Sequence, residues 1–334
     1  GIKIFNTLGH KISIDKENLI EDYIETLKDN EFKNNNTILN NVSIEIKNEY
    51  IKFCLKQSKK FSTNNINVTL DLANGSNYQI AEKVFEEFGF NIFAYNNKPN
   101  GKNINKNCGS TSINNLPDLV KRNNSDYGLS MDGDGDRIVI VNNDGKILDG
   151  DDILYTIIRG KLFNKEEVKG VVGTIMTNLA FENFLKKEKI KFLRTSVGDK
   201  NVLEAMIKNG FTIGGETSGH ILLLDKLTSG DSIIASLVFL YYSSILKSSG
   251  ENDFLKKFPQ KLTNLKINKN LPENIINIAI RETLDKYSDN EIRLIIRKSG
   301  TENCVRIMVE AESDKIVEEK SKEVCGFISD KLKK

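Results

Sequence analysis

The chain has 334 residues, 39% of them hydrophobic, which is enough for two or three domains with ordinary cores. Its 48 basic and 46 acidic residues are interspersed and leave a net charge of only +2, which argues against nucleic acid or an anionic membrane as the main partner. The most apolar stretch, residues 232–246, is shorter than the roughly 20 residues that span a bilayer, so we expect a buried core helix there.

The cysteines and histidines indicate the redox environment and the kind of metal site to expect. The chain shows no CxxC spacing and no secretory leader, which predicts reduced thiols in a cytoplasmic protein. The four widely spaced cysteines are Cys54, Cys108, Cys304 and Cys325. With only two histidines, His10 and His220, histidine-based metal chemistry is disfavoured.

The first residues predict the end of a domain rather than a whole one. Gly1 to Phe5 alternates like a half-buried strand, and after a turn Asp15 is expected to cap a helix over 16–28 with one apolar face. Such a segment cannot form a domain, and the chain starts with Gly rather than Met. We therefore predict that residues 1–36 are the remnant of a first α/β domain whose larger part lies upstream, followed by a polar linker at 33–37.

Residues 37–147 predict a parallel α/β sheet, because helical and strand periodicities alternate. Strands are expected at 67–72, 91–95 and 126–130, and helices at 45–60, 78–88 and 115–121. The last strand leads into the loop Asp132 to Arg137 and then into the apolar run 138–141. The loop therefore follows the carboxyl end of a strand, where ligands usually bind in such sheets.

The loop itself predicts a metal site. Asp132, Asp134 and Asp136 would repel one another unless a cation lay between them, and the intervening glycines allow the backbone to turn all three toward one point. Hard oxygen ligands favour Mg²⁺ or Ca²⁺ over zinc. An EF-hand loop is excluded because its sixth and twelfth positions, which need Gly and Glu, hold Arg137 and Asn143. A solvated acidic turn without metal is the remaining alternative.

Residues 148–250 predict a second α/β unit. Strands are expected at 170–173, 191–195 and 211–213, with helices at 178–189 and 201–208. The third strand ends in a glycine-rich loop that carries Glu216, Ser218 and His220, a set able to bind sugar hydroxyls while the backbone comes close. A tight glycine turn with incidental polar residues, and a structural role for His220, are the alternatives.

Residues 251–334 predict a smaller α+β unit. Its expected elements are a helix at 273–287, strands at 291–297 and 305–310, and a helix from Asp314. Between the strands lies the loop 297–302, whose arginine, hydroxyls and free amides suit a phosphate group; a plain basic hairpin tip is the alternative. The candidate phosphate-binding residues are Arg297, Ser299, Gly300, Thr301 and Arg306.

Taken together, the three loops resemble those of the α-D-phosphohexomutase superfamily in identity, order and spacing. The segments 104–111 and 197–200 are similar to the phosphoglucosamine branch of that superfamily. The resemblance covers essentially the whole chain, with one departure at Asn303, where the family usually has Pro. It implies two α/β domains of the phosphohexomutase type and a smaller C-terminal α+β domain, after the remnant of a first α/β domain. The expected boundaries are 1–36, 37–147, 148–250 and 251–334.

The resemblance also implies an activity. The expected reaction interconverts glucosamine 6-phosphate and glucosamine 1-phosphate through a phosphoserine and glucosamine 1,6-bisphosphate, toward UDP-N-acetylglucosamine and cell-wall precursors. The family's phosphoserine lies in a Ser-His-Asn-Pro segment just upstream of Gly1, so we expect this chain to be inactive alone. Phosphomannomutase or phosphoglucomutase activity, and sugar-phosphate binding without turnover, remain alternatives.

Roles follow residue by residue from the resemblance. Asp132, Asp134 and Asp136 would hold Mg²⁺, and Arg137 would support the transferring phosphoryl group. Lys3 and His220 are candidates for general acid–base work, although Lys3 without the family would be an ordinary strand lysine. The remaining candidates bind the sugar through Gly198, Asp199, Glu216 and Ser218, and the non-reacting phosphate through Arg297, Ser299, Gly300, Thr301 and Arg306. The expected partner is a small sugar phosphate, not nucleic acid or membrane, and a homodimer is left open.

Overall fold

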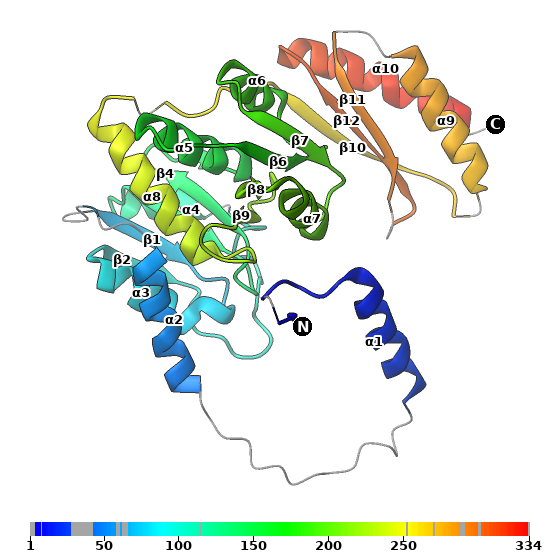
Figure 1. Ribbon diagram of the computed structural model, residues 1–334. Helices are drawn as coiled ribbons and strands as arrows, with labels where there is room; N and C mark the ends of the chain where they lie inside the picture. Colours follow the sequence, from blue (N-terminus) through cyan, green and yellow to red (C-terminus); the bar gives the residue numbers. More distant parts are fainter. Residues whose placement is uncertain are drawn as a thin grey trace. The chain divides into compact units, whose positions relative to one another are not determined.

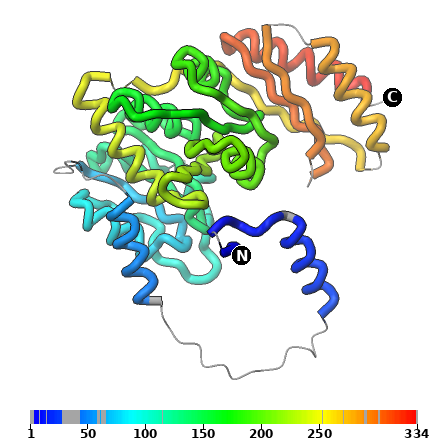
Figure 2. The backbone as a smooth tube through the Cα atoms, viewed as in Figure 1, coloured from blue at the N-terminus to red at the C-terminus, as the bar shows by residue number. Residues whose placement is uncertain are grey.

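The structure is a computed structural model, drawn in Figures 1 and 2, and its described residues form two compact units. The first comprises residues up to 177 together with 185–254, and the second comprises 178–184 together with residues from 255 onward. The described residues are 4–7, 9–27, 43–57, 61, 66–113, 115–251, 253–269, 271–287, 291–299 and 302–332. The predicted linker at 33–37 lies outside them.

A five-stranded sheet with the order β2-β1-β3-β4-β5 carries the loop of residues 132–137, named the metal loop after its predicted role. Its strands are β1 (Asn67–Asp71), β2 (Asn91–Tyr95), β3 (Tyr127–Met131), β4 (Ile138–Asn142) and β5 (Ile147–Leu148). Strands β1, β2 and β3 are parallel, as predicted, but β4 and β5 run antiparallel. The three strands predicted for the parallel sheet are confirmed, and the sheet continues with two antiparallel strands, because a connection as short as the metal loop can join only antiparallel neighbours.

The helices beside this sheet follow the predicted pattern with one break. They are α2 (Ser43–Gln57), the 3₁₀ helix η2 (Ser76–Gln79), α3 (Ala81–Phe88) and α4 (Leu116–Arg122). The single helix predicted over 78–88 is divided into η2 and α3. Gly89 ends α3 in the left-handed conformation, with φ of 92°, as its position predicts.

A second, four-stranded sheet has the order β7-β6-β8-β9. Its strands are β6 (Gly170–Thr174), β7 (Lys191–Thr195), β8 (Ile213–Gly215) and β9 (Ile221–Leu223), and the helices of this region are α5 (Gly150–Phe163), α6 (Leu179–Lys187), α7 (Asp199–Asn209) and α8 (Ser232–Ser248). Helix α8 is buried along most of its length and packs against α5 (Figure 1), which confirms the predicted core helix. No helix among the described residues combines the length and apolarity needed to cross a bilayer.

The N-terminal segment differs from its prediction. Phe5 and Lys11 form an antiparallel bridge, and helix α1 spans Ile14–Thr26. Asp15 lies inside the first turn rather than at the cap, so the predicted capping role is wrong; the flanking Ser13 makes no side-chain cap either. The predicted apolar face is uncovered, since Leu19 and Tyr23 are 67% and 65% exposed.

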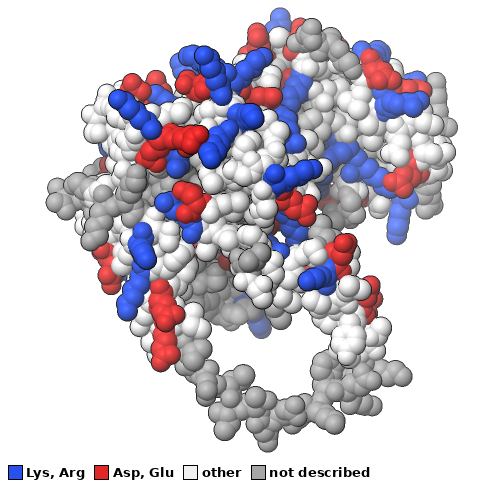
Figure 3. Space-filling model, viewed as in Figure 1, with Lys and Arg blue, Asp and Glu red and all other residues white. Residues whose placement is uncertain are grey.

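The second unit is an antiparallel sheet with the order β10-β12-β11 and two helices. Its elements are β10 (Gln260–Lys266), α9 (Glu273–Lys286), β11 (Arg293–Lys298), β12 (Cys304–Glu310) and α10 (Asp314–Leu332). Helix α10 packs against β10, β12 and α9 over a buried core that includes Val305, Val309 and Val324. On the face shown in Figure 3, acidic and basic side chains are interspersed, as the composition predicts.

Candidate functional site

The metal loop is a tight turn built around one carboxylate oxygen. Oδ1 of Asp132 accepts hydrogen bonds from the backbone amides of Gly135, Asp136 and Arg137, each at 3.1 Å. Gly135 has a φ of +78°, in the left-handed region where glycine is favoured. Because three backbone amides hold Oδ1, the carboxylate of Asp132 is fixed in direction.

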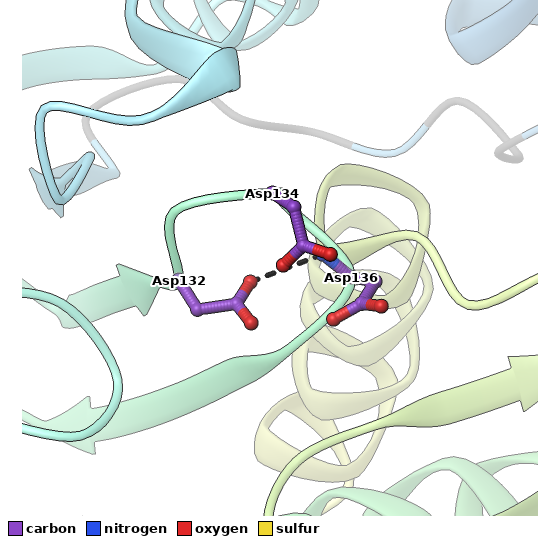
Figure 4. A group of neighbouring side chains, drawn as sticks. All are labelled: Asp132, Asp134 and Asp136. Atoms are coloured by element: carbon purple, nitrogen blue, oxygen red, sulfur yellow. Dashed lines mark hydrogen bonds between the residues drawn. The ribbon is translucent and has the colours of Figure 1, made fainter. Parts of the chain in front are cut away.

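The three aspartates come together as predicted. One carboxylate oxygen from each of Asp132, Asp134 and Asp136 lies within 4.8 Å of the others, and Figure 4 shows the side chains turned toward one another. Burial, and then the charges of Asp136 and Asp134, raise the pKa of Asp132 to about 6. A cation among the three would offset this repulsion, and an all-oxygen donor set fits Mg²⁺.

The glycine-rich loop of residues 215–220, named the sugar loop after its predicted role, is a hairpin between β8 and β9. The amide of Glu216 donates to the carbonyl of His220 at 3.0 Å, and the amide of Gly219 donates to the carbonyl of Glu216 at 2.9 Å. Glu216 is only 6% exposed, and its Oε1 accepts the amide of Gly198 at 2.9 Å. Two of the predicted sugar-binding residues are therefore in direct contact, whereas Ser218 is exposed at the tip.

The metal loop and the sugar loop are joined through their backbones, although they belong to different predicted domains. The amide of Ile138 donates to the carbonyl of Gly219 at 3.0 Å, and Arg137 and His220 form an antiparallel bridge. A Cβ on Gly219 would lie 2.1 Å from the carbonyl oxygen of Ile138. The two loops therefore form one continuous site, and glycine is required at the point of contact.

His220 occupies the centre of this site. It is 2% exposed, with Nδ1 3.6 Å from Oδ2 of Asp136 and Nε2 3.9 Å from Oδ2 of Asp199. Its Nε2 is buried without a hydrogen-bond partner among the described residues. The imidazole therefore lies between the carboxylate of Asp136, a predicted metal ligand, and that of Asp199, a predicted sugar-binding residue, where a proton could pass between them.

Lys11 joins the same cluster, and the sequence had not singled it out. Its ammonium group forms an ion pair with the carboxylate of Asp199, and the lysine side chain is 13% exposed. Burial alone would raise the pKa of Asp199, but Lys11 and His220 hold it below its ordinary value. Asp199 is thus kept ionised at the beginning of helix α7.

The phosphate loop lies in the second unit, and its arginines are paired across strands. Arg297 and Arg306 are directly opposite each other on β11 and β12, an arrangement that like charges disfavour unless an anion is present. Nη2 of Arg306 donates to Glu302 at 2.9 Å, while its buried Nε has no partner among the described residues. Oγ of Ser299 accepts the amide of Glu302 at 3.2 Å. The predicted residues Lys3, Gly300 and Thr301 lie outside the described part of the chain.

Besides Lys11, residues that support the two loops were missed. Oγ1 of Thr217 in the sugar loop donates to the buried carboxylate of Asp151 at 3.2 Å, and Ser232 at the start of α8 contacts the metal loop. The signal available in the sequence was weak. Asp151 and Ser232 each lie in the first turn of a helix, just after the capping residues Asp149 and Asp231, where such residues are common without a role in a site.

Comparison with known proteins gives three family matches in chain order. Residues 48–145 match domain II of the phosphoglucomutase/phosphomannomutase family, residues 149–258 match its α/β/α domain III, and residues 253–326 match its C-terminal domain. Together the three matches cover most of the chain, including the metal, sugar and phosphate loops.

Relatives and solved structures agree with these matches. Phosphoglucosamine mutases from Psychromonas ingrahamii and Fusobacterium nucleatum are 39% and 36% identical over 98% and 99% of this chain, which covers 75% of each relative. An N-acetylphosphoglucosamine mutase from Aspergillus fumigatus, crystallised with GlcNAc-6P and magnesium, has the same fold, with a TM-score of 0.63 and 21% identity over 84% of this chain and 68% of that one. The chain therefore belongs to the α-D-phosphohexomutase superfamily and, within it, to the phosphoglucosamine mutases.

Proposed function

We propose that this chain supplies the metal, sugar and phosphate sites of an enzyme that interconverts glucosamine 6-phosphate and glucosamine 1-phosphate. The observation that carries the proposal is the backbone junction between the two loops, which places Asp136 beside His220 in one site. The substrate class rests on the names of the relatives, which are phosphoglucosamine mutases.

The reaction is two phosphoryl transfers in opposite directions. In the first, a phosphoserine gives its phosphoryl group to O1 of glucosamine 6-phosphate, which yields the 1,6-bisphosphate and a serine hydroxyl. After the bisphosphate has turned around, the serine takes the phosphoryl group from O6 and glucosamine 1-phosphate remains. Such transfers depend on positioning and charge neutralisation more than on covalent help from the protein.

The residues of the metal loop are proposed to provide the charge neutralisation. Asp132, Asp134 and Asp136 would hold Mg²⁺, which neutralises charge on phosphoryl oxygens when bound. Arg137 follows the third aspartate and is proposed to bind the phosphoryl group in transit. Lys3 and, as the second candidate, His220 are proposed to give or take the proton of the sugar hydroxyl.

The other loops are proposed to hold the substrate in either orientation. Glu216 and Ser218, supported by Gly198 and Asp199, would bind the sugar hydroxyls. In the second unit, Arg297 and Arg306, which lie opposite each other on β11 and β12, would bind the phosphate that is not reacting. The five predicted phosphate-binding residues would thus hold the end of the substrate that does not react.

A coupled assay tests the proposal. The protein expressed from its complete coding sequence is given Mg²⁺, a trace of hexose 1,6-bisphosphate and equal concentrations of glucosamine 1-phosphate, glucose 1-phosphate or mannose 1-phosphate. We expect the highest kcat/KM on glucosamine 1-phosphate. A higher value on either hydroxyl sugar would make the enzyme a phosphoglucomutase or phosphomannomutase, because a single C2 contact changes selectivity by only a few kcal/mol. Binding of all three sugars without turnover would leave a sugar-phosphate-binding protein.

A further inference from the structure

The metal loop is held from outside by the first residue of helix α8. The carbonyl of Gly135 accepts two hydrogen bonds from Ser232, one from its amide at 3.0 Å and one from its Oγ at 2.8 Å. Ser232 is fully buried. A single side chain thus supplies the second bond on a carbonyl that lies between two of the proposed metal ligands.

Asn77, in the 3₁₀ helix η2, orients the serine hydroxyl. Its amide nitrogen donates to Oγ of Ser232 at 3.0 Å and to Sδ of Met131 at 3.3 Å. Because Oγ of Ser232 receives a hydrogen from Asn77, its own hydrogen is directed at the carbonyl of Gly135. The packing is close as well, since a Cβ on Gly135 would lie 2.6 Å from Nδ2 of Asn77.

The same peptide group is held at its other end by a metal ligand. The carbonyl of Gly135 and the amide of Asp136 belong to one planar peptide, so fixing the oxygen also fixes the direction of the N–H. That N–H donates to Oδ1 of Asp132 at 3.1 Å. A continuous series of hydrogen bonds therefore runs from Asn77 to Ser232, through the Gly135 peptide, to the carboxylate of Asp132. Hydrogen bonds in series strengthen one another.

We propose that Asn77 and Ser232 are positioning residues for the Mg²⁺ site, which orient the Gly135 peptide and thereby the carboxylate of Asp132. The inference rests on the metal site of the proposed function, and neither residue need touch the ion. Outer hydrogen-bond partners of metal ligands affect metal affinity by ~10–100-fold. Because Ser232 acts through a peptide group rather than directly on the ligand, we expect the lower end of this range.

The first test compares Ser232→Ala with Ser236→Ala. Ser236 is a matched control, because it is buried on the same helix and its hydroxyl donates at 2.6 Å to the helix carbonyl of Ser232 rather than to the metal loop. Mn²⁺ binding is titrated by electron paramagnetic resonance, and hydrogen exchange of the amides of Gly135 to Arg137 is followed without metal. We expect Ser232→Ala to weaken Mn²⁺ binding ~10-fold and to speed exchange of these amides, with wild-type behaviour in Ser236→Ala. Equal Mn²⁺ affinities and equal exchange in the two variants would overturn the inference.

A second variant, Asn77→Ala, tests the same proposal if Ser232→Ala does not fold. Asn77→Ala leaves the serine in place but removes the group that orients its hydroxyl, so it should also weaken Mn²⁺ binding and speed exchange. If both residues act through one peptide, the double variant should lose less than the product of the two single losses. If the loss of Mn²⁺ affinity in the double variant equals the product of the two single losses, the two residues do not act through one series of hydrogen bonds. Absence of Mn²⁺ binding in the wild type would reject the metal site itself, whereas unaltered amide exchange in both single variants would reject only the positioning role.

Discussion

The backbones of Gly219 and Ile138 touch so closely that no side chain fits between them. Gly219 belongs to the sugar loop, and Ile138 is the first residue after the metal loop. The amide of Ile138 donates to the carbonyl of Gly219, and a Cβ on Gly219 would lie 2.1 Å from the carbonyl oxygen of Ile138. This contact fixes the position of Asp136 relative to His220. The geometry of the site therefore depends on a glycine, which has no side chain that could take part in the reaction.

Gly219→Ala is expected to separate the two loops. Gly219 has a φ of +91°, so alanine there meets both backbone strain and a collision with backbone atoms. Gly101→Ala is the matched control, because Gly101 has a φ of +82° and nothing within 4 Å of the added Cβ. In urea denaturation we expect Gly219→Ala to lower the free energy of unfolding by about 3 kcal/mol and Gly101→Ala by about 1 kcal/mol. Equal losses would show that the contact is not tight.

Asp134→Asn should weaken Mg²⁺ binding while leaving the fold intact. Asp134 is exposed, and its charge adds to the repulsion that raises the pKa of Asp132. Titration calorimetry should show Mg²⁺ affinity reduced at least ~10-fold. Without Mg²⁺ the variant should unfold at the same or a higher temperature than the wild type, since repulsion is relieved. The exposed Asp118→Asn on α4 controls for lost charge, and an unchanged Mg²⁺ affinity in Asp134→Asn would reject the metal assignment.

The sequence predicted the features that depend on local pattern. The metal loop could be predicted because its carboxylates and glycines alternate within one turn. Helix α8 could be predicted because it is a long apolar run. Strand β10 was missed because its alternating residues are mostly polar. Helix α5 was missed although Asp149 and Asp152 form a capping box at its start, because its buried residues lie on nearly all sides and form no single apolar face. The contacts of Gly219 with Ile138 and of Ser232 with Gly135 could not be predicted, since backbone groups carry them between segments far apart in the chain.

Asp231→Asn should change how stability depends on pH. Burial raises the pKa of the Asp231 carboxyl, although hydrogen bonds from Tyr50 at 2.6 Å and from the amide of Ile234 at 2.9 Å favour its ionised form. Because the unfolded pKa is about 3.9, the native state holds the proton over a higher pH range. This carboxyl therefore contributes fully to stability below about pH 3.9, and its contribution is lost as pH rises through the native pKa.

The loss of this contribution with rising pH can be measured directly. In urea denaturation, the free energy of unfolding of the wild type minus that of Asp231→Asn should fall as pH rises from about 4 toward neutrality. Asparagine can still accept the helix amide, which keeps the cap in place. The same comparison with Asp118→Asn, an exposed aspartate, serves as the control. A difference that grows with pH would mean that the ionised carboxylate of Asp231 is favoured in the native state.

Arg306→Gln should weaken phosphate binding in the second unit. Arg306 lies opposite Arg297 on the neighbouring strand, and an anion bound near both would offset the repulsion between the two guanidinium groups. We expect affinity for inorganic phosphate, measured by calorimetry at low salt, to fall roughly tenfold, because a charge-assisted hydrogen bond is lost. Lys266→Gln on β10 removes the same charge from the same sheet and should leave affinity unchanged. If both variants lose affinity equally, general charge rather than the arginine pair would hold the anion, and high salt would then abolish the difference from wild type.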